Sequence, residues 1–197
     1  MKLLRYGPKG LEKPGLLDGE GRIRDLSGLV SDITPDLLHG EGLARLKAVD
    51  PESLPLVEGE PRLGTPVNGS RKFIAIGLNF ADHAAESGLP EPTEPVVFMK
   101  AITCLTGPND EVMIPRGSEK TDWEVELGIV IGRAASYVEQ AQALDHIAGY
   151  VRINDVPERA FPSFEVIAGS SVEEVDVNLK DMLPGLFQGK TKKRRMK

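Results

Sequence analysis

The 197-residue chain lacks the features that mark several large classes of protein. Cysteine occurs once, at Cys104, so no internal disulfide forms and a cytoplasmic location is the expectation. No apolar run reaches membrane-spanning length, and the first residues show no signal-peptide core. Glycine-rich phosphate loops, Gly-x-Ser-x-Gly elbows and zinc-type Cys/His spacings are absent as well. The sequence therefore predicts a globular protein without a membrane partner.

Positive charge is scarce outside one end of the sequence. Residues 190–197 hold six Lys or Arg and no acid, which leaves 18 basic against 30 acidic residues elsewhere. An acidic body argues against nucleic-acid binding by the fold itself. The run Lys192–Arg195 has the composition of a nucleic-acid or nuclear-import patch, but a solvated end is the interpretation we favour.

Residues 1–68 read as a small N-terminal α+β unit. The expected elements are a strand, a hairpin with a glycine-rich turn, a helix capped by Thr34 and a second helix, in that order: Met1–Gly7, Gly15–Leu26, Thr34 onward and Glu41–Val49. Four prolines interrupt Pro51–Gly69, which we interpret as a linker.

Residues 69–160 alternate strands and helices without a regular βαβ repeat, so we expect a strand-rich α+β fold. The predicted strands are Lys72–Ile76, Val96–Met99, Glu124–Gly132 and Ala148–Ile153, and the predicted helices are Asn79–Ser87, ended by Gly88, and Val138–Ile147.

Two carboxylates stand side by side on one face of the strand at 124–132. Glu124 and Glu126 are two positions apart, and strand geometry places both on one face. The apolar residues of the other face should point into a core: Trp123, Val125, Leu127, Ile129 and Ile131. Either the acidic face is wet and the pair has no special role, or a hard cation such as Mg²⁺ or Ca²⁺ lies between the carboxylates.

Three further residues carry candidate chemistry. His83 and Glu86 stand three apart in a predicted helix, where the carboxylate would orient the imidazole as a general base; a solvated helix face is the alternative. Asp155 follows a strand, so it is either a turn residue or a third oxygen ligand for Mg²⁺ beside Glu124 and Glu126.

Several motifs in one order give the segment Lys72–Arg159 a resemblance to the fumarylacetoacetate hydrolase superfamily. They are Gly77-Leu78-Asn79-Phe80-x-x-His83-x-x-Glu86, Pro95-Val96-Val97-Phe98-Met99-Lys100, Asp122-Trp123-Glu124-Val125-Glu126-Leu127-x-x-Val130-Ile131-Gly132, Ala148-Gly149-Tyr150 and Asn154-Asp155-Val156. The N-terminal unit also resembles the accessory domain of longer bacterial members, which include acylpyruvate hydrolase-like and ureidoglycolate lyase-like proteins.

The resemblance implies a role for each matching residue. Glu124, Glu126 and Asp155 would bind the divalent metal, Mg²⁺ or else Mn²⁺ or Ca²⁺, while His83 and Glu86 would activate water. Asn79 and Lys100 would bind substrate. The implied fold is a mixed β roll, usually dimeric. The implied reactions are hydrolysis, lyase, decarboxylation or isomerase steps on small 2-oxo or 2,4-dioxo acids.

The resemblance ends near residue 160. Pro157 replaces the serine of the family pattern Asn-Asp-Val-Ser-x-Arg, and we expect it to shift the Asp155 loop. The later lysine and Gly-Pro-rich segment of the family have no counterpart. We therefore expect residues 161–197 to be a divergent tail that leaves the roll incomplete, with apolar strands exposed and low activity. A non-catalytic fragment or interaction module is the alternative function.

Overall fold

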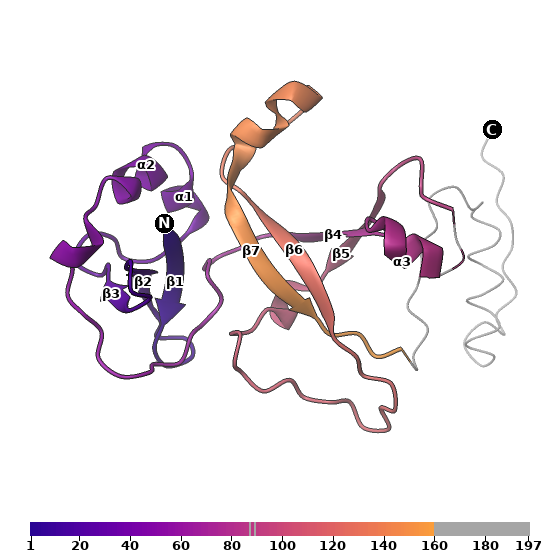
Figure 1. Cartoon of the computed structure of the whole chain (residues 1–197), viewed down its shortest axis with the longest axis horizontal. Helices are drawn as coiled ribbons and strands as arrows, with labels where there is room; N and C mark the ends of the chain where they lie inside the picture. The colour runs from indigo at the N-terminus through magenta and orange to yellow at the C-terminus, as the bar shows by residue number, and fades with distance from the viewer. Residues whose placement is uncertain (87, 89, 160–197) are drawn as a thin grey trace, which may run out of the picture. The chain divides into compact units, whose positions relative to one another are not determined.

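The computed structural model describes residues 1–86, 88 and 90–159, with His83 and Glu86 described through their backbone alone. These residues form two compact units, one from Met1–Phe73 together with the chain from Met99 onward, and one from Ile74–Phe98. Three small sheets and several short helices make a strand-rich α+β fold, as predicted (Figure 1). The domain boundaries at residues 68 and 160 stay predictions, and the predicted tail lies outside the described residues.

The N-terminal region builds a three-stranded antiparallel sheet in the order β1-β2-β3. Its strands are β1 (Lys2–Tyr6), β2 (Lys13–Leu17) and β3 (Ile23–Asp25), which confirms the predicted strand and hairpin. Asp18 fixes the hairpin turn, because its carboxylate accepts hydrogen bonds from the backbone N–H groups of Glu20 and Arg22 at 3.0 and 2.9 Å.

Two short helices and the sheet enclose the main core. In α1 (Pro35–Leu38) the Thr34 hydroxyl accepts from the backbone N–H of Leu37 at 3.3 Å, so the predicted cap is present. The second helix, α2 (Glu41–Lys47), also lies where its pattern predicted. The core consists of buried leucines from both layers: Leu16, Leu26, Leu46 and Leu54.

The segment Pro51–Gly69 is not a linker, and that interpretation was wrong. After the 3₁₀ turn η1 (Pro51–Ser53), its backbone bonds both edges of the N-terminal sheet. Val57 N–H donates to the Ile23 carbonyl at 2.9 Å, and Gly7 N–H donates to the Arg62 carbonyl at 2.8 Å. Proline removes a donor only at its own position, so the residues between prolines remain able to pair.

The second unit contains most of the first two strands expected after residue 71 and the helix between them. Strand β4 (Phe73–Gly77) pairs with β5 (Val96–Lys100) in a two-stranded sheet, and α3 (Ala81–Glu86) lies between them in sequence. Gly88 adopts a φ of 68° just after α3, a conformation that favours glycine at helix ends. The predicted helix end is therefore confirmed.

A long antiparallel hairpin provides the third sheet. It consists of β6 (Glu124–Ile131) and β7 (Ile147–Asp155), whose register shifts between Val130 and Ile131 (Figure 1). Asp155 is the last residue of β7 rather than a turn residue after it. A short 3₁₀ turn, η2 (Ile102–Cys104), precedes the hairpin.

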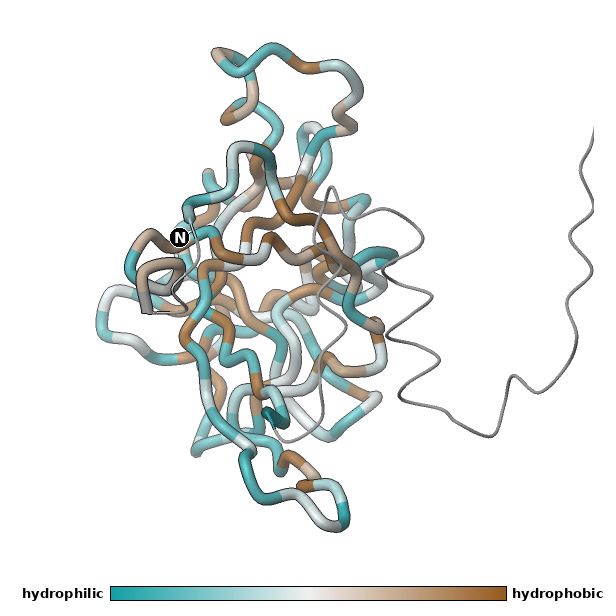
Figure 2. Tube along the Cα trace, turned by 90° about the vertical axis from the view of Figure 1, so that its right-hand side faces the viewer, coloured by the Kyte–Doolittle hydropathy of each residue, from teal (hydrophilic) through white to brown (hydrophobic). Residues whose placement is uncertain are grey.

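The predicted helix over 138–147 is a 3₁₀ helix instead, η3 (Gln140–His146). Its N-cap, Glu139, makes no side-chain hydrogen bond to the first turn, and short uncapped segments often take the tighter 3₁₀ form. Along the chain, hydrophobic runs are short and alternate with hydrophilic ones (Figure 2). Across the described part of the chain, no helix has the length and apolar character needed to span a bilayer.

Candidate functional site

The β6–β7 hairpin presents three carboxylates on one face. Glu124 pairs with Asp155 across the two strands, and Glu126 pairs with Ile153. Directly opposed residues share a face, as do residues two apart on one strand. Glu124, Glu126 and Asp155 therefore form one half-buried group, which we call the carboxylate face.

Two basic side chains pair with the carboxylate face. Lys100 Nζ lies 2.6 Å from Asp155 Oδ2, and Arg159 Nη2 lies 2.5 Å from Glu124 Oε1. Arg159 Nε also contacts Asp122 Oδ2 at 3.0 Å. The side chains of Lys100 and Asp155 are each 25% exposed, so this ion pair is screened less than a surface pair, whereas the Arg159 side chain is 46% exposed.

The protonation of this cluster follows from those contacts. The pKa of the Arg159 guanidinium is raised, mainly by its hydrogen bond to Asp122 and next by its hydrogen bond to Glu124. The backbone N–H of Trp123, followed by Arg159, lowers the pKa of the Asp122 carboxyl. Both shifts favour the charged forms, so Arg159 and Asp122 stay ionised across the physiological range.

The donor set fits a hard divalent cation in kind, since all three side chains are carboxylates. Mg²⁺ and similar ions prefer carboxylate oxygens as ligands, and three carboxylate side chains share this face. Over residues 1–86, 88 and 90–159, however, no three His, Cys, Asp or Glu side chains already converge as ligands. Lys100 and Arg159 instead pair with two of the three carboxylates, Asp155 and Glu124.

A short segment next to the hairpin supports the end of the carboxylate face. Pro157 carbonyl accepts from Asp122 N–H at 3.1 Å, and Arg159 N–H donates to the Lys120 carbonyl at 3.0 Å. The Glu158 carboxylate accepts from Lys120 N–H at 3.1 Å and from the Thr121 hydroxyl at 2.8 Å. These bonds continue the strand pairing beyond Asp155.

Pro157 does not remove Asp155 from the strand pairing, and the expected shift of the Asp155 loop stays a prediction. Asp155 remains in β7 opposite Glu124, and Pro157 takes part in the pairing as an acceptor. Proline is compatible with a ladder position where only its carbonyl bonds. Sequence reasoning also gave no role to Arg159, although it occupies the arginine position of the motif that contains Asp155.

The predicted general base, His83 with Glu86, lies on a different element from the carboxylate face. His83 and Glu86 are three positions apart in α3, which belongs to the second unit, so the predicted helical spacing is present. Asn79 is exposed at the start of this segment, and Leu78 before it adopts a φ of 49°. A non-glycine residue in the left-handed region is strained, and such strain clusters at functional turns.

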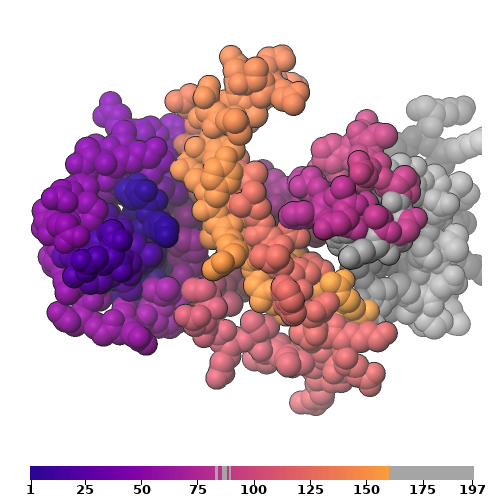
Figure 3. Space-filling view, viewed as in Figure 1, coloured from indigo at the N-terminus to yellow at the C-terminus, as the bar shows by residue number. Residues whose placement is uncertain are grey.

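The apolar face of the hairpin is exposed, and the expectation that it packs into a core was wrong. Along β6 and just before it, the exposed fractions are 70% for Trp123, 62% for Val125, 62% for Leu127, 52% for Ile129 and 59% for Ile131. Atoms of the hairpin reach the surface in the space-filling view (Figure 3). The exposure agrees instead with the second expectation, that apolar strands of an incomplete roll are left exposed.

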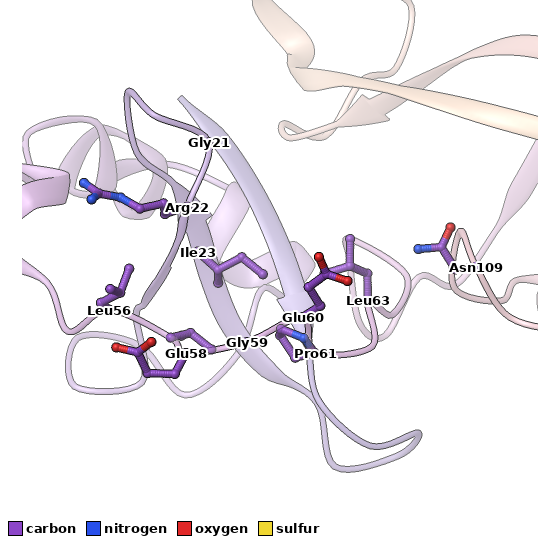
Figure 4. A pocket seen from close by; sticks show the side chains of 11 residues that line it. Gly21, Arg22, Ile23, Leu56, Glu58, Gly59, Glu60, Pro61, Leu63 and Asn109 are labelled. Atoms are coloured by element: carbon purple, nitrogen blue, oxygen red, sulfur yellow. The ribbon is translucent and has the colours of Figure 1, made fainter.

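A separate pocket of about 540 Å³ opens in the N-terminal region, and Figure 4 shows its lining. Arg22, Glu58 and Glu60 supply its charges, and Ile23 and Leu56 its apolar wall. None of the candidate site residues lines it. The carboxylate face is therefore the better candidate for chemistry.

The fold and the carboxylate face define a strand-rich α+β protein with an acidic candidate site. A family model described as "Fumarylacetoacetate (FAA) hydrolase C-terminal" matches residues 72–173, slightly more than half of the chain. The chain belongs to the fumarylacetoacetate hydrolase family, as its motifs predicted.

Individual relatives agree with this assignment. A Burkholderia lata protein provisionally named a hydrolase is 62% identical over 159 residues, covering 81% of this chain and 56% of the relative. The fumarylacetoacetate hydrolase from Exiguobacterium antarcticum shows 31% identity and a TM-score of 0.64, over 81% of this chain and 57% of its own. The 5-carboxymethyl-2-hydroxymuconate delta-isomerase from Mycobacterium smegmatis shows 28% identity and a TM-score of 0.54, over 81% and 56%. The chain thus spans about half the length of the curated relatives it matches.

Proposed function

We propose that this chain carries the metal-binding part of a hydrolase or lyase for small 2-oxo or 2,4-dioxo acids. The observation that carries the proposal is the pairing of Glu124 with Asp155 beside Glu126, within the residues that the family model matches. The names of the structural relatives support both a hydrolytic and an isomerising version. A homodimer and a cytoplasmic location remain predictions.

The chain's own residues would divide the reaction between two regions. A divalent ion at Glu124, Glu126 and Asp155 would supply a Lewis acid for the 2-oxo-carboxylate and for the enolate charge that develops as the C–C bond breaks. His83, oriented by Glu86, would take a proton from the water that attacks the distal carbonyl. Asn79 and Lys100 would bind the acid end of the substrate.

Metal binding is tested by thermal unfolding of the full chain with and without Mg²⁺ or Mn²⁺. A ligand that binds only the folded state raises the melting temperature. Glu126→Gln should abolish that rise, whereas Glu58→Gln in the N-terminal region should leave it unchanged. A rise of equal size in both variants would contradict the proposed site.

Catalysis is tested on acylpyruvates with the same metals. His83→Ala should lower kcat by about 10²–10⁴-fold, the usual contribution of a general base, while the metal-induced rise in melting temperature remains. Turnover that does not change in this variant would assign His83 and Glu86 to an ordinary solvated helix face.

A non-catalytic interaction module is the second candidate, and the exposed apolar face of the hairpin favours it. Exposed apolar patches mark binding surfaces or partly assembled folds. Metal binding without turnover on any oxo acid would support this candidate. Robust turnover would exclude it.

A further inference from the structure

We infer that Lys100 and Arg159 act as built-in substitutes for the metal, holding the carboxylate face together until a divalent cation displaces them. The inference rests on the proposed function, because it concerns the same three carboxylates. It assigns Lys100 a role before substrate binding, and it assigns Arg159 a role that sequence reasoning did not give it.

The geometry of the charges supports this assignment. Glu124 and Asp155 lie directly opposite each other, with Glu126 beside them, so three negative charges share a small, half-buried area. Like charges at opposed strand positions destabilise a sheet. Lys100 and Arg159 relieve this repulsion from two directions, with contacts of 2.6 and 2.5 Å to Asp155 and Glu124.

The positions of Lys100 and Arg159 in the chain allow their ion pairs with the carboxylates to break and re-form. Lys100 is the last residue of β5, and Arg159 lies beyond the end of β7, so the side chain of neither takes part in the β6–β7 ladder. Both can withdraw without breaking the β6–β7 ladder. A divalent ion neutralises more charge than either side chain and offers several coordination sites at once, so it should win the competition.

A consequence for affinity follows. Each metal ion that binds must separate two ion pairs and approach two positive charges. The wild-type affinity is therefore lower than the carboxylates alone would give. Once displaced, Lys100 is released beside the site, where its ammonium group can bind the carboxylate of an acid substrate.

The test uses Mn²⁺ alone and the full chain, with isothermal titration and thermal unfolding of Lys100→Met and of Arg159→Gln. Each variant should bind Mn²⁺ about two- to fivefold more tightly, since a partly exposed ion pair no longer has to be broken. Without metal, each should melt below wild type. Saturating Mn²⁺ should close that gap, because the ion replaces the missing positive charge.

Arg62→Gln is the matched control. Arg62 makes a two-bond ion pair with Asp110, with both N–O distances at 2.6 Å, and it contacts none of the three candidate ligands. Its loss should lower the melting temperature by an amount that Mn²⁺ does not restore. Arg159→Gln carries the test alone if Lys100→Met does not fold.

The outcomes separate this inference from the proposed function. Wild-type binding with equal or weaker Mn²⁺ affinity in both variants would overturn the inference and leave the metal site intact. A melting-temperature gap that persists in saturating Mn²⁺ would also overturn it. Failure of wild type and both variants to bind Mn²⁺ would overturn the metal site and the inference together.

Discussion

The N-terminal sheet and the β6–β7 hairpin are both antiparallel, yet their apolar residues have opposite environments. Leu16 and Leu26 in the N-terminal region are 1% and 0% exposed, whereas Leu127 in β6 is 62% exposed. Helices and the Pro51–Gly69 segment enclose the first sheet, while the described residues leave the apolar face of the hairpin open to solvent. Alternation along a strand determines which residues share a face, whereas a second layer of structure determines whether that face is buried in a core.

The charged residues differ in the same way. The Asp18 side chain is fully buried against Arg24, whose side chain is 10% exposed. In the hairpin, the Arg159 side chain that pairs with Glu124 is 46% exposed. The ion pair between Asp18 and Arg24 is shielded from solvent, whereas the ion pair between Arg159 and Glu124 is partly accessible to it.

The largest difference should come from truncating apolar side chains. Leu26→Ala should destabilise the protein by about 2–5 kcal/mol, since it leaves a cavity in the core. Leu127→Ala should change the free energy of unfolding by less than about 0.5 kcal/mol, as exposed substitutions do. Urea unfolding of both variants measures this. Equal losses would show that another layer covers the hairpin in solution.

A smaller effect should separate two glycines on the same face of the hairpin, one crowded and one open. A side chain at Gly128 would place Cβ 2.6 Å from Val151 Cγ1 and Ile153 Cδ1, whereas nothing lies within 4 Å of a Cβ at Gly149. Gly128→Ala should therefore cost about 1–3 kcal/mol through overpacking. Gly149→Ala should be neutral or slightly stabilising. Denaturant midpoints for the pair check this, and the opposite ranking would contradict it.

Acid should distinguish the two sets of ion pairs. Burial alone would raise the pKa of the Asp18 carboxyl, but the Arg22 N–H and the Arg24 and Arg22 side chains outweigh burial and hold that pKa below its usual range. The resulting stabilisation is complete above about pH 4, the usual aspartate pKa, and disappears as the pH falls toward the lower folded value.

Melting temperatures between about pH 5 and pH 2 test this difference. Arg24→Gln should flatten the acid dependence more, because the buried Asp18 carboxylate loses one of its two arginine partners. Arg159→Gln should flatten it less, because its ion pairs are half-exposed. Equal slopes in the two variants would argue that the regions do not differ in this respect.

The smallest effect concerns a single hydroxyl in the N-terminal region. Burial, and then the charge of nearby Asp25, raise the pKa of Tyr6 to about 12. The neutral form is favoured by folding, so stability should fall as the pH rises from about 10, the usual tyrosine value, through 12. Ultraviolet titration should show Asp25→Asn lowering this pKa, with Tyr6→Phe identifying the signal. An unchanged titration would remove Asp25 as a cause.

Much of the local structure could be predicted from sequence because its causes are local. The Thr34 cap, the Asp18 turn and the helix end at Gly88 each depend on residues within four positions. Period-2 alternation was enough to place Glu124 and Glu126 together. Pro51–Gly69 was misread because edge pairing depends on a distant sheet that local composition does not describe.

The amino-acid sequence by itself determined the order of the elements, the shared face of Glu124 and Glu126, and membership of the family through its motifs. Only the tertiary structure decided that Asp155 lies opposite Glu124, that Lys100 reaches Asp155 across 55 positions, and that the apolar face of β6 stays open. The physical reason is range: propensity and alternation act over a few residues, whereas register, ion pairing and burial depend on which distant segments meet.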